Sequence, residues 1–146
     1  IPIFGFIYKR AAIMVDRKSS KSRWGVYERS NKVIKKGLSI CIFPEKDYLD
    51  NRKLLNEFKR GAFKLSIDHQ IPIVPMAFLD CKRKFPWHTN YGKPGKLRVE
   101  TFSTIYPKKK HDKIENLQKT TRQIILNALK NDPLQKNKEA IDLEYN

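Results

Sequence analysis

Two short polar motifs follow apolar runs and have the residue types for chemistry on an anionic substrate. Asp16-Arg17 follows the run "AAIMV", and Pro44-Glu45 follows the run "LSICIF". An arginine can hold a phosphate through two parallel hydrogen bonds, whereas a lysine supplies only a point charge. Arg17 is therefore the best single candidate for anion binding. The alternative is that Asp16 and Arg17 are ordinary solvated turn residues.

Four runs rich in branched residues predict the strands that would position these motifs. They are residues 11–15, 38–43, 72–78 and 97–102, and the first three are apolar enough to be buried on both faces. Helical patterns separate the first three, so we predict an α/β fold, a single domain with a mostly parallel sheet flanked by helices. Because the carboxyl ends of parallel strands meet at one edge of a sheet, Arg17 and Glu45 are expected to face one shared hollow.

Three segments have the apolar spacing of amphipathic helices. The first covers residues 22–37, with Gly37 as its predicted stop; the second covers 51–70, and the third covers about 112–130. The expected inward faces are Val26, Ser30, Val33 and Ile34; then Leu54, Leu55, Phe58, Ala62 and Leu65; then Ile114, Leu117, Thr121, Ile124, Ile125 and Ala128. We predict a domain over residues 1–130 and a tail over 131–146.

Charge and composition limit the classes of partner. Among 146 residues, 31 Lys and Arg face 15 Asp and Glu, which gives a net charge of +16. Such a field attracts nucleic acid, anionic lipid or a phosphorylated substrate without choosing among them. No apolar run approaches the roughly 18 residues of a membrane-spanning helix. Cys41 and Cys81 lack metal-ligand spacing, so we expect no metal and predict buried or idle thiols.

Three segments taken in order resemble the glycerolipid acyltransferase family, and in particular the bacterial type of 1-acylglycerol-3-phosphate acyltransferase. They are "IPIFGFIYKRAAIMVDR", "ICIFPEKDY" and "FKRGAFKLSIDHQIPIVPMAF". The family has four blocks in fixed order: HxxxxD, a block ending in Asp-Arg, a block usually written FPEGTRS, and a proline-flanked apolar strand. The last three have counterparts here, within roughly the first hundred residues. Three motifs in order are far more specific than one.

The resemblance implies a substrate-binding role for particular residues. Arg17, after Asp16, would hold the phosphate of the acyl acceptor. Phe43, Pro44 and Glu45 match the third block, whereas Lys46 replaces its glycine and Asp47 its threonine, and no arginine follows at once. Lys46 would supply charge in place of the close backbone approach that glycine permits. In the fourth block, Ile71 to Val74, including Ile73, would line the acyl or acceptor pocket.

The HxxxxD block has no counterpart, because none of the three histidines has an Asp five positions later. His69 leads to Val74, His88 to Lys93 and His111 to Asn116. In the family, this histidine takes the proton of the acceptor hydroxyl and the aspartate orients its ring. We therefore expect no catalytic residue in this chain, a chain truncated before that block, and no activity of this piece alone.

The resemblance implies transfer of a fatty acyl group from acyl-CoA or acyl carrier protein to the hydroxyl of lysophosphatidic acid, without a metal or tightly held cofactor. The alternative is a non-catalytic basic domain that binds lipid or nucleic acid; no zinc spacing or basic recognition helix supports the latter. We expect a membrane-associated protein at the cytoplasmic face. Phe85, Trp87 and Tyr91 would touch lipid at the interface or form a local packing cluster.

Overall fold

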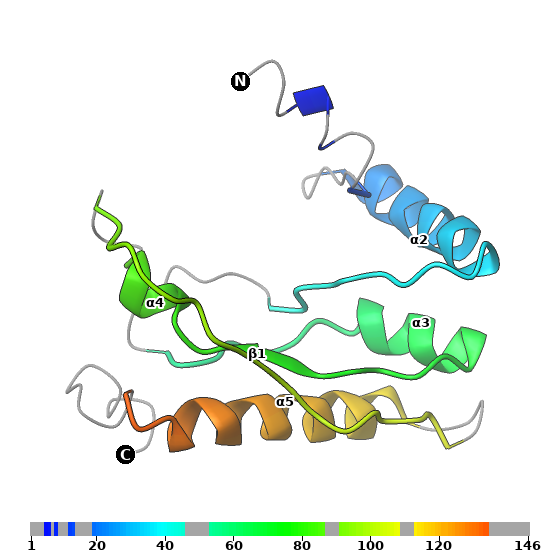
Figure 1. Cartoon of the computed structure of the whole chain (residues 1–146). Coiled ribbons are helices and arrows are strands. Elements are labelled where there is room, and N and C mark those ends of the chain that lie inside the picture. Colours follow the sequence, from blue (N-terminus) through cyan, green and yellow to red (C-terminus); the bar gives the residue numbers. More distant parts are fainter. Residues whose placement is uncertain are drawn as a thin grey trace. The chain divides into compact units, whose positions relative to one another are not determined.

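The computed structural model describes residues 5, 6, 8, 12, 13, 19–45, 53–86, 91–108 and 113–134. It divides into two compact units, Ile1–Phe43 (unit 1) and Pro44–Asn146 (unit 2). Each unit is described by itself, with helices and strands labelled as in Figure 1. The predicted boundary between a domain over 1–130 and a tail over 131–146 stays a prediction, because residues 135–146 lie outside the described part.

Unit 1 contains helix α2, Ser20–Lys35, where the sequence predicts a helix. Ser30 is buried, and Val26, Val33 and Ile34 are half-buried, so the predicted inward face is confirmed. Gly37 ends the helix with φ of 74°, and its N–H donates to the carbonyl of Ile34 at 2.8 Å. This left-handed backbone favours glycine, which explains why the helix stops here.

The prediction of a buried strand at residues 38–43 is wrong. These residues belong to no strand, and Leu38, Ile42 and Phe43 are exposed. An apolar run becomes a strand only when a neighbouring backbone satisfies its N–H and C=O groups, and no ladder partner for 38–43 exists among the described residues. Of the predicted strand at 11–15, only Ala12 and Ile13 are described, and neither lies in a strand.

Unit 2 holds a two-stranded antiparallel sheet of β1, Met76–Phe78, and β2, Val99–Thr101. Ala77 pairs with Glu100 in its register. An isolated bridge extends the pairing, since the N–H groups of Ile73 and Ile105 each donate to the other's carbonyl at 2.9 and 2.8 Å. The fold is therefore a mixture of helices and a small sheet; the mostly parallel sheet that we predicted is not seen in the described part of the chain.

Helix α3 covers Gly61–His69, which is only the second half of the helix predicted at 51–70. The described part of the first half, residues 53–60, is irregular. Its backbone groups are engaged elsewhere: the N–H of Lys59 donates to the carbonyl of Pro44 at 2.7 Å, and Phe58 forms an isolated bridge with Glu45. Because these groups have tertiary partners, they are not available for a helical ladder.

The core of unit 2 forms where α3, the irregular segment 53–60 and helix α5 meet. Helix α5 covers Ile114–Asn131, close to the predicted 112–130, and β1 and α3 both lie along it (Figure 1). Phe63 stacks on Phe58 with ring centroids 6.1 Å apart. The buried cluster consists of Leu54, Leu55, Phe58, Phe63, Ile67, Leu117, Leu126 and Leu129. Of the predicted apolar stripe, Leu54, Leu55, Phe58 and Leu65 are buried and Ala62 is half-buried, although the first three of these residues are not helical.

A short helix, α4, Cys81–Lys84, lies between β1 and β2. None of the described helices is both long enough and apolar enough to cross a membrane.

Candidate functional site

The predicted site residues are only partly covered by the structure. Phe43, Pro44, Glu45, Ile73 and Val74 are described, whereas Asp16, Arg17, Lys46 and Asp47 lie outside the described residues. The predicted meeting of Arg17 and Glu45 in one hollow therefore stays a prediction, and so do the roles assigned to Lys46 and Asp47.

Glu45 is held by the segment that follows it in unit 2. Its carboxylate Oε2 accepts a hydrogen bond from the backbone N–H of Asn56 at 3.0 Å, and its backbone forms the bridge with Phe58. Pro44 and Glu45 are half-buried. A hydrogen bond from a backbone N–H to a carboxylate fixes the direction of the charge as well as its position. The side chain of Glu45 is thus fixed at a point where solvent or ligand can still reach it.

Helix α5 supports this segment from the other side. Arg122 donates from Nη2 to the carbonyl of Leu55 at 2.6 Å and from Nε to the carbonyl of Asn56 at 3.1 Å. Gln118, one turn earlier, donates to the carbonyl of Phe58 at 2.5 Å. These side chains satisfy carbonyl groups that no helix or strand would otherwise pair. Sequence reasoning missed both residues.

Ile73 and Val74 face in opposite directions. Ile73 is half-buried and packs against the core cluster, whereas Val74 is 51% exposed. Successive residues of extended chain point to opposite sides, so only Val74 is free to line a pocket from this position. Phe43, the last residue of unit 1, is 73% exposed.

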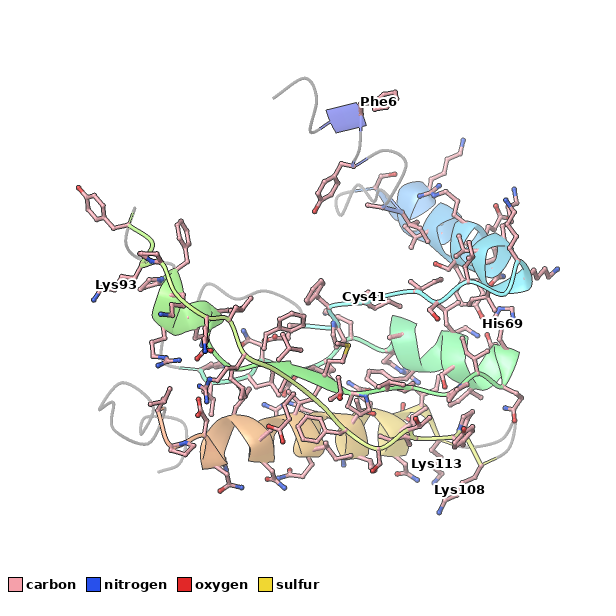
Figure 2. All side chains as sticks on the ribbon, viewed as in Figure 1. Phe6, Cys41, His69, Lys93, Lys108 and Lys113 are labelled. Carbon is pink, nitrogen blue, oxygen red and sulfur yellow. The ribbon has the colours of Figure 1, made fainter. Side chains whose placement is uncertain are left out.

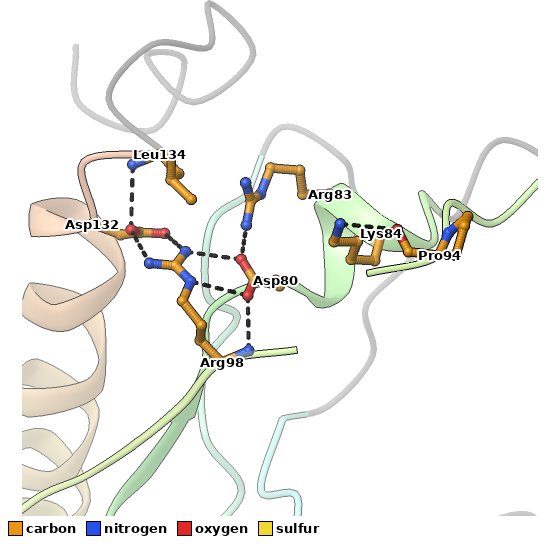
Figure 3. A network of polar contacts seen from close by, with 7 residues as sticks. All are labelled: Asp80, Arg83, Lys84, Pro94, Arg98, Asp132 and Leu134. Carbon is orange, nitrogen blue, oxygen red and sulfur yellow. Dashed lines mark hydrogen bonds and ion pairs between the residues drawn. The ribbon is translucent and has the colours of Figure 1, made fainter. Parts of the chain in front are cut away.

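A second polar cluster ties the ends of β1, β2 and α5 together (Figure 3). Arg98 donates to both carboxylate oxygens of Asp80 and to both of Asp132, at distances from 2.8 to 3.0 Å. The backbone N–H of Arg98 also donates to Asp80 at 2.8 Å, and Arg83 of α4 forms an ion pair with Asp80. The side chains of Asp80 and Asp132 are each only 1% exposed. Two buried carboxylates are therefore matched by two guanidinium groups.

The ionisation of this cluster follows from its hydrogen bonds. The hydrogen bonds from Arg98 hold the pKa of Asp132 below its ordinary value of 3.8, against the opposing effect of burial. The same contact raises the pKa of Arg98. Both side chains are charged at neutral pH, and the cluster is structural rather than poised for proton transfer.

The remaining candidates for chemistry are few. Both cysteines are exposed, so of the predicted buried or idle thiols the buried alternative is wrong and the idle one stays a prediction; partial burial raises the pKa of the Cys81 thiol. His69 is the last residue of α3 and is half-buried; His88 and His111 lie outside the described residues. No three His, Cys, Asp or Glu side chains in the described ranges are grouped so that they could hold a metal ion.

Comparison with known proteins places the chain in a family. The model of the Acyltransferase family matches residues 1–79. The chain is 31% identical over 67 residues to a "Probable 1-acyl-sn-glycerol-3-phosphate acyltransferase" of Mycoplasma pneumoniae, which covers 46% of this chain and 25% of that protein. It is 31% identical over 91 residues to human "1-acyl-sn-glycerol-3-phosphate acyltransferase beta", covering 58% of this chain and 32% of that protein.

A third relative covers more of the chain. The "1-acyl-sn-glycerol-3-phosphate acyltransferase" of Cocos nucifera is 31% identical over 106 residues, or 71% of this chain and 34% of that protein. The chain thus spans between 25% and 34% of the length of these relatives. No solved structure matches it significantly. The family match covers more than half of the chain and includes all three blocks that the sequence pointed to, so the chain belongs to the glycerolipid acyltransferase family.

Proposed function

We propose that this chain is part of an enzyme that acylates lysophosphatidic acid. The hydroxyl oxygen of the acceptor attacks the carbonyl carbon of a fatty acyl thioester, carried by acyl-CoA or acyl carrier protein. An ester bond forms, the carbon–sulfur bond breaks, and the proton of the hydroxyl passes through a general base to the leaving thiolate. The names of the three relatives support this acceptor, and the donor is proposed from the chemistry of the resemblance.

The observation that carries the proposal is the fixed carboxylate of Glu45 inside the third family block. A carboxylate held by the N–H of Asn56 at 3.0 Å, and half-buried, has a defined direction before any ligand arrives. Preorganised polar groups of this kind lose little free energy to reorganisation when the substrate binds. We assign Glu45 to the acceptor site together with Arg17, whose guanidinium would hold the acceptor phosphate.

The general base is proposed to come from the rest of the enzyme. No histidine among the 146 residues has an Asp five positions later, so we assign acceptor binding to this chain and proton transfer to the HxxxxD block of the whole protein. The proposed reaction needs no metal and no tightly held cofactor, because the thioester is already activated for attack by an oxygen.

The proposed location follows from the substrate. Lysophosphatidic acid carries a fatty chain and resides in a bilayer, whereas acyl-CoA and acyl carrier protein are dissolved in the cytoplasm. The enzyme would therefore work at the cytoplasmic face of a membrane, and the net charge of +16 would favour a surface rich in anionic lipid.

The test is acyl transfer by the complete protein. A radiolabelled acyl-CoA, or the corresponding acyl carrier protein, is incubated with detergent-dispersed lysophosphatidic acid, and the diacyl product is separated and counted. Arg17→Ala should raise the acceptor KM at least tenfold, because the phosphate loses a bidentate partner worth about 1.5–3 kcal/mol. Arg60→Ala, which removes an exposed arginine paired with Glu115 at 2.7 Å, is the matched control and should change KM less than twofold.

Two outcomes would refute the proposal. One is a complete protein that transfers no acyl group to lysophosphatidic acid from either donor. The other is an Arg17→Ala enzyme with the KM of the unaltered protein, which would remove Arg17 from the acceptor site.

A further inference from the structure

The described parts of the connection between β1 and β2 extend from the core of unit 2 (Figure 1). We call residues 81–86 and 91–97 the α4 projection. Its two sides are joined, since the N–H of Lys93 donates to the carbonyl of Lys84 at 2.7 Å. In addition, the Nζ of Lys84 donates to the carbonyl of Pro94 at 3.2 Å. These hydrogen bonds hold the two segments of the projection together.

Two glycines in segment 91–97 let side chains of segment 81–86 pack directly on the backbone. A Cβ added to Gly92 would lie 2.7 Å from the ring of Phe85, and one added to Gly95 would lie 2.3 Å from Nζ of Lys84. Gly95 also has φ of 140°, which other residues rarely adopt. Phe85 and Lys84 are thus seated against bare backbone, and their positions are set by the fold.

The apolar side chains of the α4 projection nevertheless face solvent. Tyr91 is 82% exposed, Phe85 is 62% exposed and Leu97 is 51% exposed. Trp87 lies outside the described residues, so the alternative of a local packing cluster of Phe85, Trp87 and Tyr91 stays a prediction, although the exposure of Phe85 and Tyr91 favours contact with lipid. An aromatic ring that is held in position and still exposed to water, as Phe85 is, is typical of surfaces that bind a partner.

The charge of the projection is one-sided. Residues 81–98 contain Lys82, Lys84, Lys93 and Lys96 in addition to two arginines, and no Asp or Glu. Arg83 and Arg98 are matched at the base of the projection by Asp80 and Asp132 (Figure 3). The base is therefore neutral, and the net positive charge comes from the lysines, two of which, Lys93 and Lys96, lie in the exposed segment 91–97.

We propose that the α4 projection docks on a bilayer containing anionic lipid, with Phe85 and Tyr91 at the level of the headgroups and Lys93 and Lys96 against lipid phosphates. Aromatic rings settle at the boundary between headgroups and acyl chains, and nearby lysines add attraction to anionic lipid. The proposal rests on the proposed function for the lipid nature of the partner, and it identifies the surface that meets the membrane. The test of the docking proposal measures binding to membranes and does not require acyl transfer.

The test measures partition of the 146-residue chain onto sucrose-loaded vesicles by sedimentation. Vesicles of phosphatidylcholine with about one third phosphatidylglycerol, at about 0.1 M salt, should retain the chain, and pure phosphatidylcholine should retain far less. Lys93→Gln with Lys96→Gln should lower the partition coefficient about 30-fold, because each lysine near an anionic surface contributes about 1 kcal/mol. Phe85→Ala with Tyr91→Ala should lower it about tenfold, through lost apolar contact with the interface.

Matched controls come from the opposite end of unit 2. Figure 2 shows Lys108 and Lys113 far from Lys93, so Lys108→Gln with Lys113→Gln removes the same charge elsewhere. Tyr106, which is 69% exposed, gives an aromatic control as Tyr106→Ala. Both controls should change partition less than threefold, since only the projection is proposed to touch lipid.

A second measurement does not depend on loss of binding. A dye sensitive to polarity is attached at Tyr91→Cys or at Tyr106→Cys, in a chain with Cys41→Ser and Cys81→Ser. Emission should shift to the blue on anionic vesicles for the label at position 91 and not for that at 106. Equal shifts, or equal losses for the projection and control lysine pairs, would overturn the proposal.

The competing partner gives a different result. Tight binding of duplex DNA at physiological salt, with no retention by anionic vesicles, would overturn the proposal and favour nucleic acid. Failure of the membrane proposal is separable from failure of the proposed function, because acyl transfer is assayed with acceptor dispersed in detergent. If the complete protein acylates lysophosphatidic acid but the projection variants bind vesicles as well as the unaltered chain does, only the docking proposal fails.

Discussion

Arg122 and Glu45 hold opposite sides of one residue, Asn56. The carbonyl of Asn56 accepts a hydrogen bond from Nε of Arg122 at 3.1 Å, while its N–H donates to the carboxylate of Glu45 at 3.0 Å. Helix α5 lies beyond the 79 residues that the family model matches. It nevertheless holds segment 53–60, and this segment in turn holds the side chain of Glu45. The position of the third family block therefore depends on a helix far along the chain.

The first prediction concerns Arg122. Arg122→Leu should lower the free energy of unfolding by about 1.5–3 kcal/mol, because two carbonyl groups lose a charged donor. Amide hydrogen exchange of Asn56 should become faster, since the peptide is no longer held from α5. Urea unfolding and exchange measured by NMR check these results. Lys119→Leu, an exposed position on the same helix, is the control, and unchanged exchange at Asn56 in Arg122→Leu would contradict the link.

The second prediction separates the charge of Glu45 from its shape. Glu45→Gln keeps an oxygen that accepts from the N–H of Asn56, so unfolding free energy should change by less than about 1 kcal/mol. In the complete protein, acyl transfer should fall at least tenfold, because the site loses a negative charge. Glu115→Gln, which removes an exposed carboxylate paired with Arg60, serves as the control. An active Glu45→Gln enzyme would show that the carboxylate has only a structural role.

The third prediction tests the core. Phe63 is 1% exposed and stacks on Phe58, so Phe63→Ala should lower the free energy of unfolding by about 3–5 kcal/mol through lost burial and the cavity left behind. Phe85→Ala, at a ring that is 62% exposed, should cost less than about 1 kcal/mol. Chemical unfolding of both variants provides the comparison, and equal losses would mean that Phe85 is buried in solution.

The fourth prediction is a pH dependence. The pKa of Asp132 is lowered in the folded chain, so its contribution to stability is present above the ordinary value of 3.8 and is lost as the pH falls through the lowered pKa. Asp132→Asn should cost about 1–2 kcal/mol at pH 7, since Arg98 is partly exposed and water screens the pair.

This difference should narrow as the pH falls below 3.8, the ordinary value for the carboxyl of Asp132. Urea unfolding of both proteins from pH 7 downward measures it. A difference that stays constant over this range would show that Asp132 acts through packing and not through its charge.

Local sequence patterns predict correctly those helices whose ends are determined by residues within the helix or next to it. Helix α2 ends at Gly37, whose left-handed backbone favours glycine, and α5 follows one continuous apolar stripe. The segment 53–60 has an equally regular stripe and is still not helical, because Pro44, Glu45 and Arg122 engage its backbone. Tertiary partners decide such cases, and spacing alone does not identify them.

In the candidate site, too, local patterns predict some residues, whereas residues with distant partners were missed. Glu45 was predicted from a motif of neighbouring residues, and Val74 from a proline-flanked run. Arg122 was not found, because its partner Asn56 is 66 residues away and no local pattern joins them. Arg98 and Asp132 are likewise 34 residues apart. Polar pairs that close only in the folded chain leave no periodic signal, so the supports of a site are harder to predict than its motif.

The ion pair between Asp80 and Arg98 joins the two ends of the connection between β1 and β2. The contact closes at 2.8 Å and the side chain of Asp80 is only 1% exposed, so the connection is held at its base, where Arg83 of the connection also pairs with Asp80. A connection that keeps Asp80, Arg83 and Arg98 could therefore differ in length or chemistry between residues 84 and 97 while α3 and α5 keep their packing.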